Sequence, residues 1–257
     1  MPRFSRLFLL LAVSLLLAAC QHGPRKPALY QYSTLAALMA GNYEGQTTVG
    51  ELAAKGDFGL GTYNGLDGEM VVLDGTFRRA DSSLRLNSVA SGTHVPFASL
   101  VFFAPQGQSQ LPGLPDLPGL SSWLDTQIAA PRLFAAAKVQ GTFARLTIRS
   151  VPAFSPPYPG LMEALKSQSV RELTDASGTL VGIRAPAETS GTAVPGWHFH
   201  FVSADGTTGG HVLAATPAAV QAAWMSMDRM VLDMPATGKA GTAAEIPGET
   251  VGGATKQ

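Results

Sequence analysis

Three of the five histidines in the chain lie in one short stretch, PGWHFHFVSADGTTGGHVL, at residues 195–213. Large residues alternate through its first half, a period of two that predicts a β-strand. Side chains alternate between the two faces of a strand, so His198 and His200 share one face. The dipeptide DG at 205–206 is a strong hairpin signal, and a two-residue turn there places His200 directly opposite His211.

The predicted hairpin therefore carries three imidazoles on one face, those of His198, His200 and His211. Three neutral imidazoles that leave a coordination position open are typical of a catalytic site for a divalent metal, most often zinc. We therefore predict about one Zn²⁺ ion per chain on this hairpin. Gly209 and Gly210 carry no side chains, so we expect room there for a bulky group. The alternative is three ordinary half-buried histidines without a metal. The metal site is favoured because the register that the turn defines brings the three imidazoles to one face.

The elements that must hold this hairpin are predicted to be mainly strands. The chain has 257 residues, of which 46% are hydrophobic, enough for a substantial core in one large or two small domains. Its 28 glycines and 18 prolines favour strands and turns over a helical bundle. Lys plus Arg and Asp plus Glu balance at 18 each, so no basic stripe marks a nucleic-acid partner.

Strand and turn signals follow one another along most of the chain. Short helices are predicted in 33–41 and 47–56, where Thr48 and Glu51 have the spacing of a capping box. Strands are predicted in EMVVL (69–73), TFRRA (76–80), VPFASLVFF (95–103), AAAKVQGTFARLTIRSV (135–151) and GTLVGIRAP (178–186). An irregular loop is predicted in 104–120, helices in 121–130 and 159–168, and a short helix followed by a strand in 216–235. This order predicts an α+β fold with mixed or antiparallel sheets and short helices.

The N-terminal segment MPRFSRLFLLLAVSLLLAAC has the outline of a bacterial export signal, with two arginines before an apolar run. Its last four residues, LAAC, resemble a lipobox, where lipoprotein signals are cleaved and the cysteine is lipidated. We therefore expect a signal peptide at 1–19, a lipid on Cys20 and a polar tether at 20–28. Gln21 in place of Asp suits transfer to the outer membrane, so we expect anchoring at the periplasmic face of the bacterial envelope. The alternatives are a transmembrane anchor, for which the apolar run is short, and a plain secretory signal.

Seven segments of the chain, taken in order, resemble bacterial α-acetolactate decarboxylases. They are LYQYSTLAALMAGNYEG, ELAAKGDFGLGTYNGLDGEMVVLDG, VPFASLVFF, GTFARLTIRSVP, PPYPGL, GTLVGIRAP and VPGWHFHFVSADGTTGGHVL. The resemblance implies a catalytic region over 29–235, two mixed β-sheet layers with helices, and a homodimer. The small, polar tail at 236–257 is expected to be flexible.

Members of this family convert 2-acetolactate, a small anionic 2-hydroxy-3-oxo acid, to acetoin and CO₂. The resemblance places their zinc-binding histidines on the three residues that the hairpin also selects. It places their glutamate on Glu69 in LDGEMVV, their threonine on Thr62 in GLGTYN and their arginine on Arg149 in LTIRSV.

The chain departs from this family at two places. Ala214 follows GGHVL, where relatives often carry an acidic residue. The C-terminal tail of relatives carries another active-site glutamate, and Glu245 and Glu249 are both candidates for it here without a convincing motif.

The chemistry of this reaction suits the residue types. Loss of CO₂ leaves an enediolate, whose negative charge a divalent cation stabilises as a Lewis acid. Arg149 can orient the anionic substrate through its planar fork of donors, and Glu69 can return a proton or bind the metal. Thr62 can give the substrate a hydroxyl contact. The alternatives are a surface ion pair for Arg149, a solvated carboxylate for Glu69 and a local turn bond for Thr62.

Two other functions remain open at this point. A non-enzymatic periplasmic lipoprotein that binds a metal or small ligand predicts a closed coordination shell and no response to acetolactate. A cupin-like dioxygenase predicts bound iron and a requirement for oxygen, because an HxH pair with a distant third histidine also suits iron. The ordered set of matching segments favours the decarboxylase.

Overall fold

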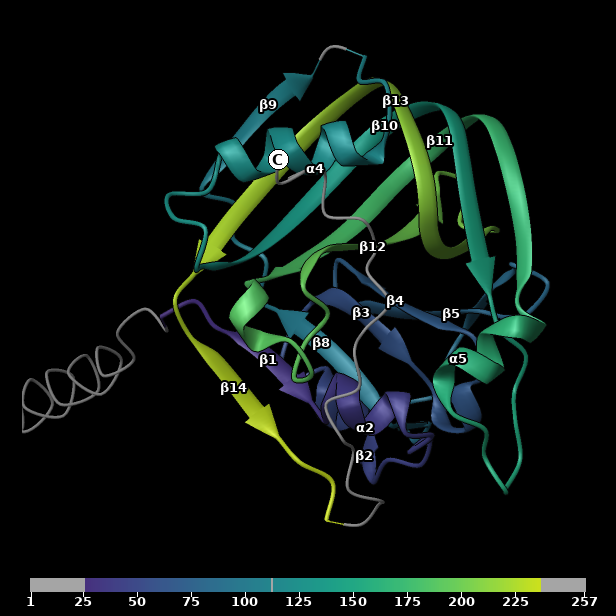
Figure 1. Ribbon diagram of the computed structural model, residues 1–257. Helices are drawn as coiled ribbons and strands as arrows, with labels where there is room; N and C mark the ends of the chain where they lie inside the picture. The colour runs from purple at the N-terminus through teal and green to yellow at the C-terminus, as the bar shows by residue number, and fades with distance from the viewer. Residues whose placement is uncertain (1–25, 112, 237–257) are drawn as a thin grey trace, which may run out of the picture.

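A computed structural model describes residues 26–111 and 113–236 of the chain (Figure 1). Two β-sheets pack against each other, and short helices lie around them. The expected signal peptide, Cys20 and the candidate glutamates Glu245 and Glu249 lie outside the described residues. Within the described ranges, no helix is long and apolar enough to span a membrane.

The first sheet is mixed. In the described part of the chain it has seven strands, in the order β14-β1-β8-β3-β4-β5-β6. The strands are β1 (Leu29–Tyr32), β3 (Phe58–Thr62), β4 (Glu69–Leu73), β5 (Thr76–Ala80), β6 (Leu86–Ser88), β8 (Phe97–Val101) and β14 (Met230–Asp233). Neighbours are antiparallel except β1 and β14, which pair in parallel. A separate short ribbon pairs β2 (Thr47–Thr48) with β7 (His94–Val95).

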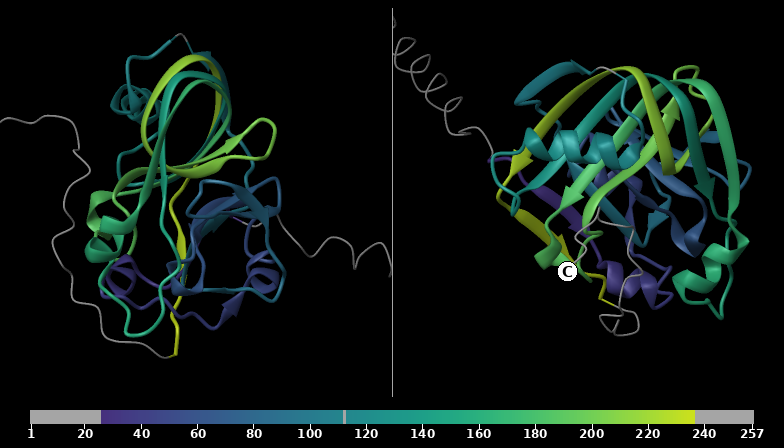
Figure 2. Two further views of the ribbon diagram at one scale, coloured as in Figure 1. Left: turned by 90° about the vertical axis from the view of Figure 1, so that its right-hand side faces the viewer. Right: turned by 45° about the horizontal axis from the view of Figure 1, so that its top comes forward.

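The second sheet is antiparallel and contains the longest strands. As far as the structure describes it, the order is β10-β11-β12-β13-β9. The strands are β9 (Gly107–Leu111), β10 (Phe134–Ser150), β11 (Ser169–Ala185), β12 (Gly196–Ser203) and β13 (Gly209–Met227). β10 also pairs with β13, so β10, β11, β12 and β13 close into a ring, visible in the left view of Figure 2. Within this ring, β12 pairs with β11 on one side and with β13 on the other.

Short helices connect the strands. They are α2 (Leu35–Met39), α3 (Val49–Leu52), α4 (Leu117–Thr126) and α5 (Leu161–Ala164), with 3₁₀ turns η1 (Asn64–Leu66), η2 (Leu165–Ser167) and η3 (Ala187–Thr189). α4 lies across the second sheet, on the face turned away from the first sheet (Figure 1). α2 and α5 contact each other. The observed class, mixed sheets with few short helices, agrees with the prediction.

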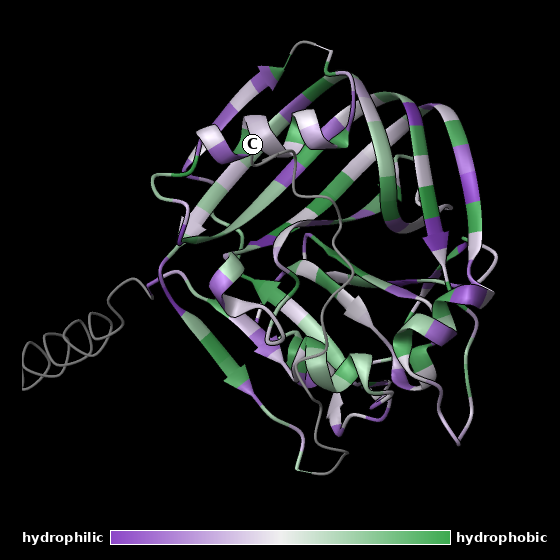
Figure 3. Cartoon of the chain, in the orientation of Figure 1, coloured by the Kyte–Doolittle hydropathy of each residue, from purple (hydrophilic) through white to green (hydrophobic). Residues whose placement is uncertain are grey.

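One hydrophobic core cluster lies between the two sheets. Val71 of β4, Ala136 of β10 and Val181 of β11 are fully buried there. Burial of each valine stabilises the fold by roughly 1.5–3 kcal/mol. A second cluster packs the other face of the second sheet against Leu120 and Leu124 of α4. Hydrophobic and hydrophilic residues alternate along β10 and β11 in Figure 3, as strands with two different faces require.

Several elements form where the sequence predicts them. β4 and β5 have the predicted bounds. Asp74 and Gly75 between them have φ of 51° and 74°, the positive values that a type I′ turn requires. Thr48 and Glu51 form the predicted capping box at the start of α3. Neighbouring residues alone determine turns and caps of this kind, so the sequence predicts them well.

Two segments differ from the prediction. The expected loop at 104–120 contains β9 and the start of α4, which Asp116 caps by accepting from the Gly119 N–H. β9 is polar and forms because it pairs with one edge of β13. The helix expected in 216–235 is wrong, since alanine-rich residues 218–223 belong to β13, between β10 and β9. Tertiary pairing overrides the helical propensity of alanine there.

Candidate metal and catalytic site

The histidine hairpin is formed by β12 and β13. His200 pairs directly with His211, which is the register that the sequence predicts. The turn is longer than expected, because Ser203 donates its N–H to the carbonyl of Thr208 and four residues form the loop. The Asp205 carboxylate holds this loop by accepting hydrogen bonds from within it and from Ser203. The register is unchanged because the loop gains one residue on each side.

The two faces of β12 have different surroundings. Trp197, Phe199 and Phe201 belong to the core that α4 covers. The rings of Trp197 and Phe199 stack there with centroids 5.5 Å apart. His198 and His200 alternate with these residues and lie on the other face, where His200 contacts β4 of the first sheet. The strand alternation thus brings two imidazoles to the interface between the sheets.

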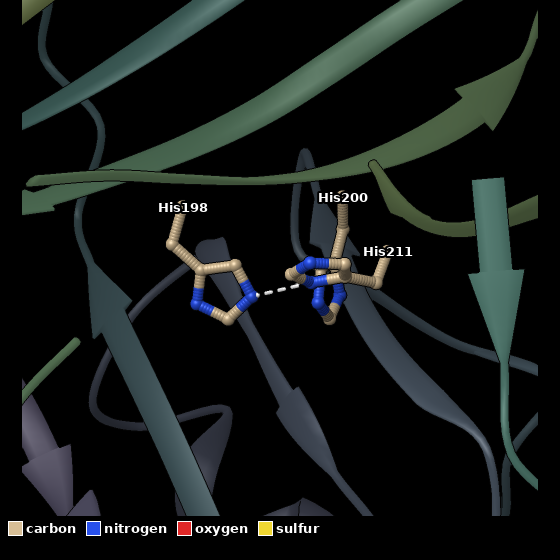
Figure 4. A group of neighbouring side chains, drawn as sticks. All are labelled: His198, His200 and His211. Atoms are coloured by element: carbon tan, nitrogen blue, oxygen red, sulfur yellow. Dashed lines mark hydrogen bonds between the residues drawn. The ribbon is translucent and has the colours of Figure 1, made fainter. Parts of the chain in front are cut away.

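His198, His200 and His211 point toward one another (Figure 4). Their candidate ligand nitrogens all lie within 4.8 Å of one another. Ring centroids are 4.8 Å apart for His198 and His211 and 5.5 Å apart for His200 and His211. His198 Nε2 and His211 Nδ1 lie 2.9 Å apart, so one ring donates a hydrogen bond to the other. This cluster could hold a metal ion.

A backbone carbonyl fixes the tautomer of His200. The His200 Nδ1 lies 2.7 Å from the carbonyl oxygen of Met70, which can only accept, so Nδ1 carries the hydrogen. Nε2 therefore presents a lone pair, and this buried atom has no hydrogen-bond partner among the described residues. A metal-binding histidine has this arrangement, with one nitrogen donating to a carbonyl and the other facing the metal. The residues present therefore fit a divalent metal.

Burial keeps His200 and His211 neutral. It lowers the pKa of His200 to about 3. It also lowers the pKa of His211 well below its ordinary value, and the positive charge of Arg149 contributes to both shifts. Imidazole binds metal in its neutral form, so these two rings are in the required state at neutral pH.

The two glycines before His211 do not leave open room, contrary to expectation. A Cβ atom at Gly209 would lie 2.6 Å from the carbonyl oxygen of Phe201. One at Gly210 would lie 2.6 Å from the carbonyl oxygen of Arg149. These glycines instead allow the backbones of β10, β12 and β13 to approach closely, which brings Arg149 beside His211.

Arg149 reaches the site from β10. It pairs directly with His211, so the two side chains share one face of the sheet. Its Nη1 is buried and has no hydrogen-bond partner within the described ranges. Arg149 lines the cavity next to the histidines, whereas Arg145 on the same strand is exposed. The position offers a guanidinium donor to an anion, and not the surface ion pair that was the alternative.

Glu69 reaches the site from the first sheet, at the start of β4. It is 9% exposed, so the alternative of a solvated carboxylate is wrong. Its Oε2 lies 3.4 Å from His200 Nε2. Burial raises the pKa of Glu69 to about 7, and the positive charge of Arg149 opposes the rise. A carboxyl group with this pKa can carry a proton near neutral pH.

Thr62 pairs directly with Glu69 across β3 and β4. Its hydroxyl donates to the carbonyl of Gly68 at 2.7 Å, which is the local turn bond that was the alternative to a substrate contact. Thr62 nevertheless lines the same cavity as Glu69. Because its hydrogen is used by Gly68, its oxygen can only accept a hydrogen bond from a ligand.

These elements surround a cavity of about 420 Å³. Its wall contains most of the predicted site residues, namely Thr62, Glu69, Arg149, His198 and His211. His200 lies behind this wall, fully buried. The other wall residues are mostly apolar, and α2, α5 and the segment before β12 contribute many of them. The charged residues and the candidate metal ligands therefore lie together on one side of the cavity, and the rest of its wall is mostly apolar.

Sequence reasoning misses the apolar wall. Leu35, Leu38 and Met39 of α2 line the cavity, and their spacing of three and four residues is the available signal, since it places them on one helix face. Ser190 and Val194, from the segment between β11 and β12, show no such periodicity. Their place in the wall depends on how that segment crosses the molecule.

Comparisons with known proteins agree on one family. Residues 29–245 match the family described as alpha-acetolactate decarboxylase. The chain is 40% identical to the alpha-acetolactate decarboxylase of Brevibacillus brevis over 73% of this chain and 66% of that protein. It is 39% identical to that of Methanosarcina mazei over 82% of this chain and 73% of that protein.

The fold is also similar to a solved structure. The crystal structure of alpha-acetolactate decarboxylase from Bacillus subtilis strain 168 matches with a TM-score of 0.80 and 32% identity, over 82% of this chain and 90% of that one. The family match covers both sheets and the histidine hairpin. The chain therefore belongs to the alpha-acetolactate decarboxylase family.

Proposed function

We propose that the chain converts 2-acetolactate to acetoin and CO₂ and uses zinc held by His198, His200 and His211. The observation that carries this proposal is the gathering of three imidazoles, a guanidinium and a buried carboxyl group at one cavity. Each group has a use in the decarboxylation of a small anionic 2-hydroxy-3-oxo acid. Membership of the family supports the same reaction.

The three histidines are the residues that would hold the metal. When bound there, a zinc ion supplies a Lewis acid that stabilises the negative charge developing on the substrate as CO₂ departs. Neutral imidazoles add no negative charge of their own, and three protein ligands leave coordination positions open. The Met70 carbonyl keeps the lone pair of His200 Nε2 directed into the cluster.

Arg149 binds and orients the anionic substrate. Its buried Nη1 donates to no other residue in the described part of the chain, and the side chain lines the cavity. A guanidinium donates two parallel hydrogen bonds to a carboxylate or to an enediolate. Because Arg149 lies opposite His211, an anion bound to it is held beside the histidine cluster.

Glu69 supplies the proton that completes the reaction. Cleavage of the bond to CO₂ leaves its electron pair on the rest of the substrate, as an enediolate. Acetoin forms when that species gains a proton on carbon. Glu69 is buried at the cavity, and this burial raises its pKa and so favours the protonated carboxyl group that the step requires. Solvent then restores the proton to Glu69.

The remaining wall orients the substrate and excludes water. The Thr62 oxygen can accept a hydrogen bond from the tertiary hydroxyl group, because its own hydrogen is bonded to Gly68. Apolar residues such as Leu35 and Leu38 suit the methyl groups of the substrate. Exclusion of water by these apolar residues also strengthens the electrostatic interactions among the charged residues of the site.

His200→Ala tests the metal assignment. We expect zinc content to fall from about one ion per chain to near zero, and acetoin formation to fall with it. The fold should persist, because the hairpin lies on a closed ring of strands. His94→Ala is the matched control, since His94 is exposed on β7 and outside the cluster.

Two results would contradict this proposal. Full zinc content in His200→Ala would remove the assignment of that ligand. Bound iron together with oxygen consumption would favour the dioxygenase.

A further inference from the structure

Gln31 of β1 is a fully buried polar side chain that sequence analysis does not single out. Its Nε2 donates to the carbonyl of Ser33 at 2.9 Å and to that of Thr192 at 2.6 Å. Its Oε1 accepts from the hydroxyl of Ser99 at 3.3 Å. Both amide hydrogens and the amide oxygen are therefore used, which fixes the orientation of the side chain.

Thr192 belongs to the segment that connects β11 to β12. Ser190, Val194 and Pro195 of this segment line the cavity, and β12 begins at the next residue. The path of the segment therefore determines part of the cavity wall. It also determines where the strand that carries His198 begins.

The same segment is hydrogen-bonded to the start of α2. The Leu35 N–H donates to the carbonyl of Thr192 at 2.9 Å, and the Ala36 N–H donates to that of Gly191 at 2.8 Å. Leu35 itself lines the cavity. Two parts of the apolar wall thus meet at the Thr192 carbonyl, which Gln31 also binds.

Gln31 also stabilises the turn that leads into α2. Ser33 in this turn has a φ of 66°, a left-handed conformation that is uncommon outside glycine. Its carbonyl accepts from Gln31, and its N–H donates to the carbonyl of Asp233 at 2.8 Å. Surrounding hydrogen bonds are what maintain a conformation of this kind, and they fix the direction in which α2 leaves β1.

We propose that Gln31 is a positioning residue for substrate binding, which ties α2 to the segment at 186–195 and so fixes the apolar wall of the cavity. This inference rests on the proposed decarboxylase function. The hydrogen bonds of Gln31 go to wall segments and to Ser99, and not to the histidine cluster. Its loss should therefore change how the substrate is held and leave zinc and Glu69 in place.

The test compares Gln31→Met with Ser99→Ala. Gln31→Met removes both donors at similar volume, whereas Ser99→Ala removes only the hydrogen bond to Oε1. For Gln31→Met we expect KM for 2-acetolactate to rise about tenfold, with kcat within about threefold and zinc content unchanged. For Ser99→Ala we expect KM to stay at the wild-type value. Gln31→Glu keeps the shape of the side chain and, when protonated, one donor, so its KM should rise less than that of Gln31→Met. This variant replaces Gln31→Met in the test if Gln31→Met does not fold.

Three results of this comparison would overturn the proposal. A Gln31→Met protein that melts at a lower temperature with unchanged KM has lost only stability. A fall in kcat without a rise in KM, or a loss of zinc, would place Gln31 in the reaction or in the metal site instead.

Amide hydrogen exchange gives a reading that needs no turnover. Gln31→Met should speed exchange at Leu35 and Ala36, whose N–H groups donate to the wall segment. Unchanged protection there would overturn the positioning role. If the wild-type chain makes no acetoin, the result counts against the proposed function. The exchange measurement still tests the positioning role of Gln31 in that case.

Discussion

Glu69 is buried, lies 3.4 Å from His200 Nε2 and has a pKa raised to about 7. This position suits either a proton donor or a metal ligand, and Glu69→Gln separates the two roles. We expect the acetoin rate to fall by about 10²–10⁴-fold with normal zinc content, because the amide keeps the size but cannot give the proton. The measurement is zinc stoichiometry and rate on the same samples.

The matched control for this variant is Glu172→Gln, an exposed carboxylate on β11. It should keep both zinc and rate. Low zinc in Glu69→Gln would show that Glu69 binds the metal. A wild-type rate in that variant would remove Glu69 from the reaction altogether.

Arg149→Lys tests the need for a planar fork of donors. We expect lower turnover with unchanged zinc content, because an ammonium group cannot make two parallel hydrogen bonds to the substrate. Arg145→Lys, an exposed change on the same strand, is the control and should behave as wild type. A steady-state rate assay on both proteins is sufficient. Full activity in Arg149→Lys would mean that charge alone is required at this position.

The sequence predicts the charged part of the site better than the apolar part. Strand alternation and a turn signal are enough to place His198, His200 and His211 on one face, because both are local features. Thr62, Glu69 and Arg149 follow from family resemblance, since their spacing in sequence carries no such signal. The role of Gln31 depends on contacts with residues as far as Thr192, and neighbouring residues do not predict them.

The hairpin depends on close contact between β13 and β10 at Gly210. A Cβ atom at this position would lie 2.6 Å from the carbonyl oxygen of Arg149, so Gly210→Ala should force the two strands apart. We expect zinc affinity to fall about tenfold and the free energy of unfolding to fall by about 1–3 kcal/mol. Competition with a chromophoric chelator measures the affinity.

The control for this variant is Gly206→Ala in the turn of the same hairpin. A Cβ atom there would meet no atom of the described residues within 4 Å, although its φ of +70° is unfavourable for alanine. This change should cost about 1 kcal/mol of stability and leave zinc affinity unchanged. Equal affinities for Gly210→Ala and wild type would show that strand separation at Gly210 does not reach the histidines.

At the level of elements, local signals and tertiary pairing each determine part of the fold. Turns such as Asp74-Gly75 and the capping box at Thr48 are local, and they form as predicted. Alanine-rich residues 218–223 favour a helix by propensity but form a strand, because β10 and β9 pair with both of their edges. The polar strand β9 also forms because of pairing, in its case with β13. The local sequence therefore predicts neither β9 nor residues 218–223 as a strand.

In the whole molecule, the packing of two sheets assembles the site. β4 supplies Glu69 and the carbonyl of Met70, and β12 supplies His200, which lies 130 positions along the chain from Met70. The general class of mixed sheets with short helices is predictable from composition and turn signals. These signals do not predict which faces of the two sheets pack together, because that depends on the summed packing of residues such as Val71 and Val181.

We propose that the chain is a lipoprotein of the bacterial envelope, anchored through Cys20. The expectation comes from the lipobox-like LAAC before the polar tether, a part of the chain outside the described residues. Cys20→Ala should move the protein from the membrane fraction to the supernatant, because a protein without the acyl chains loses its anchor. Globomycin should block maturation of the wild-type chain. Retention of Cys20→Ala on membranes after alkaline washing would contradict this location.

The central claim is that the chain decarboxylates 2-acetolactate with a metal bound at the histidine hairpin. Acetoin production by the purified chain tests it most directly, measured as isolated, after removal of metal by a chelator, and after zinc is returned. The predicted result is acetoin and CO₂ in equal amounts, loss of the activity without metal, and recovery with zinc. Folded, zinc-loaded protein that makes no acetoin, or an unchanged rate after complete metal removal, would contradict it.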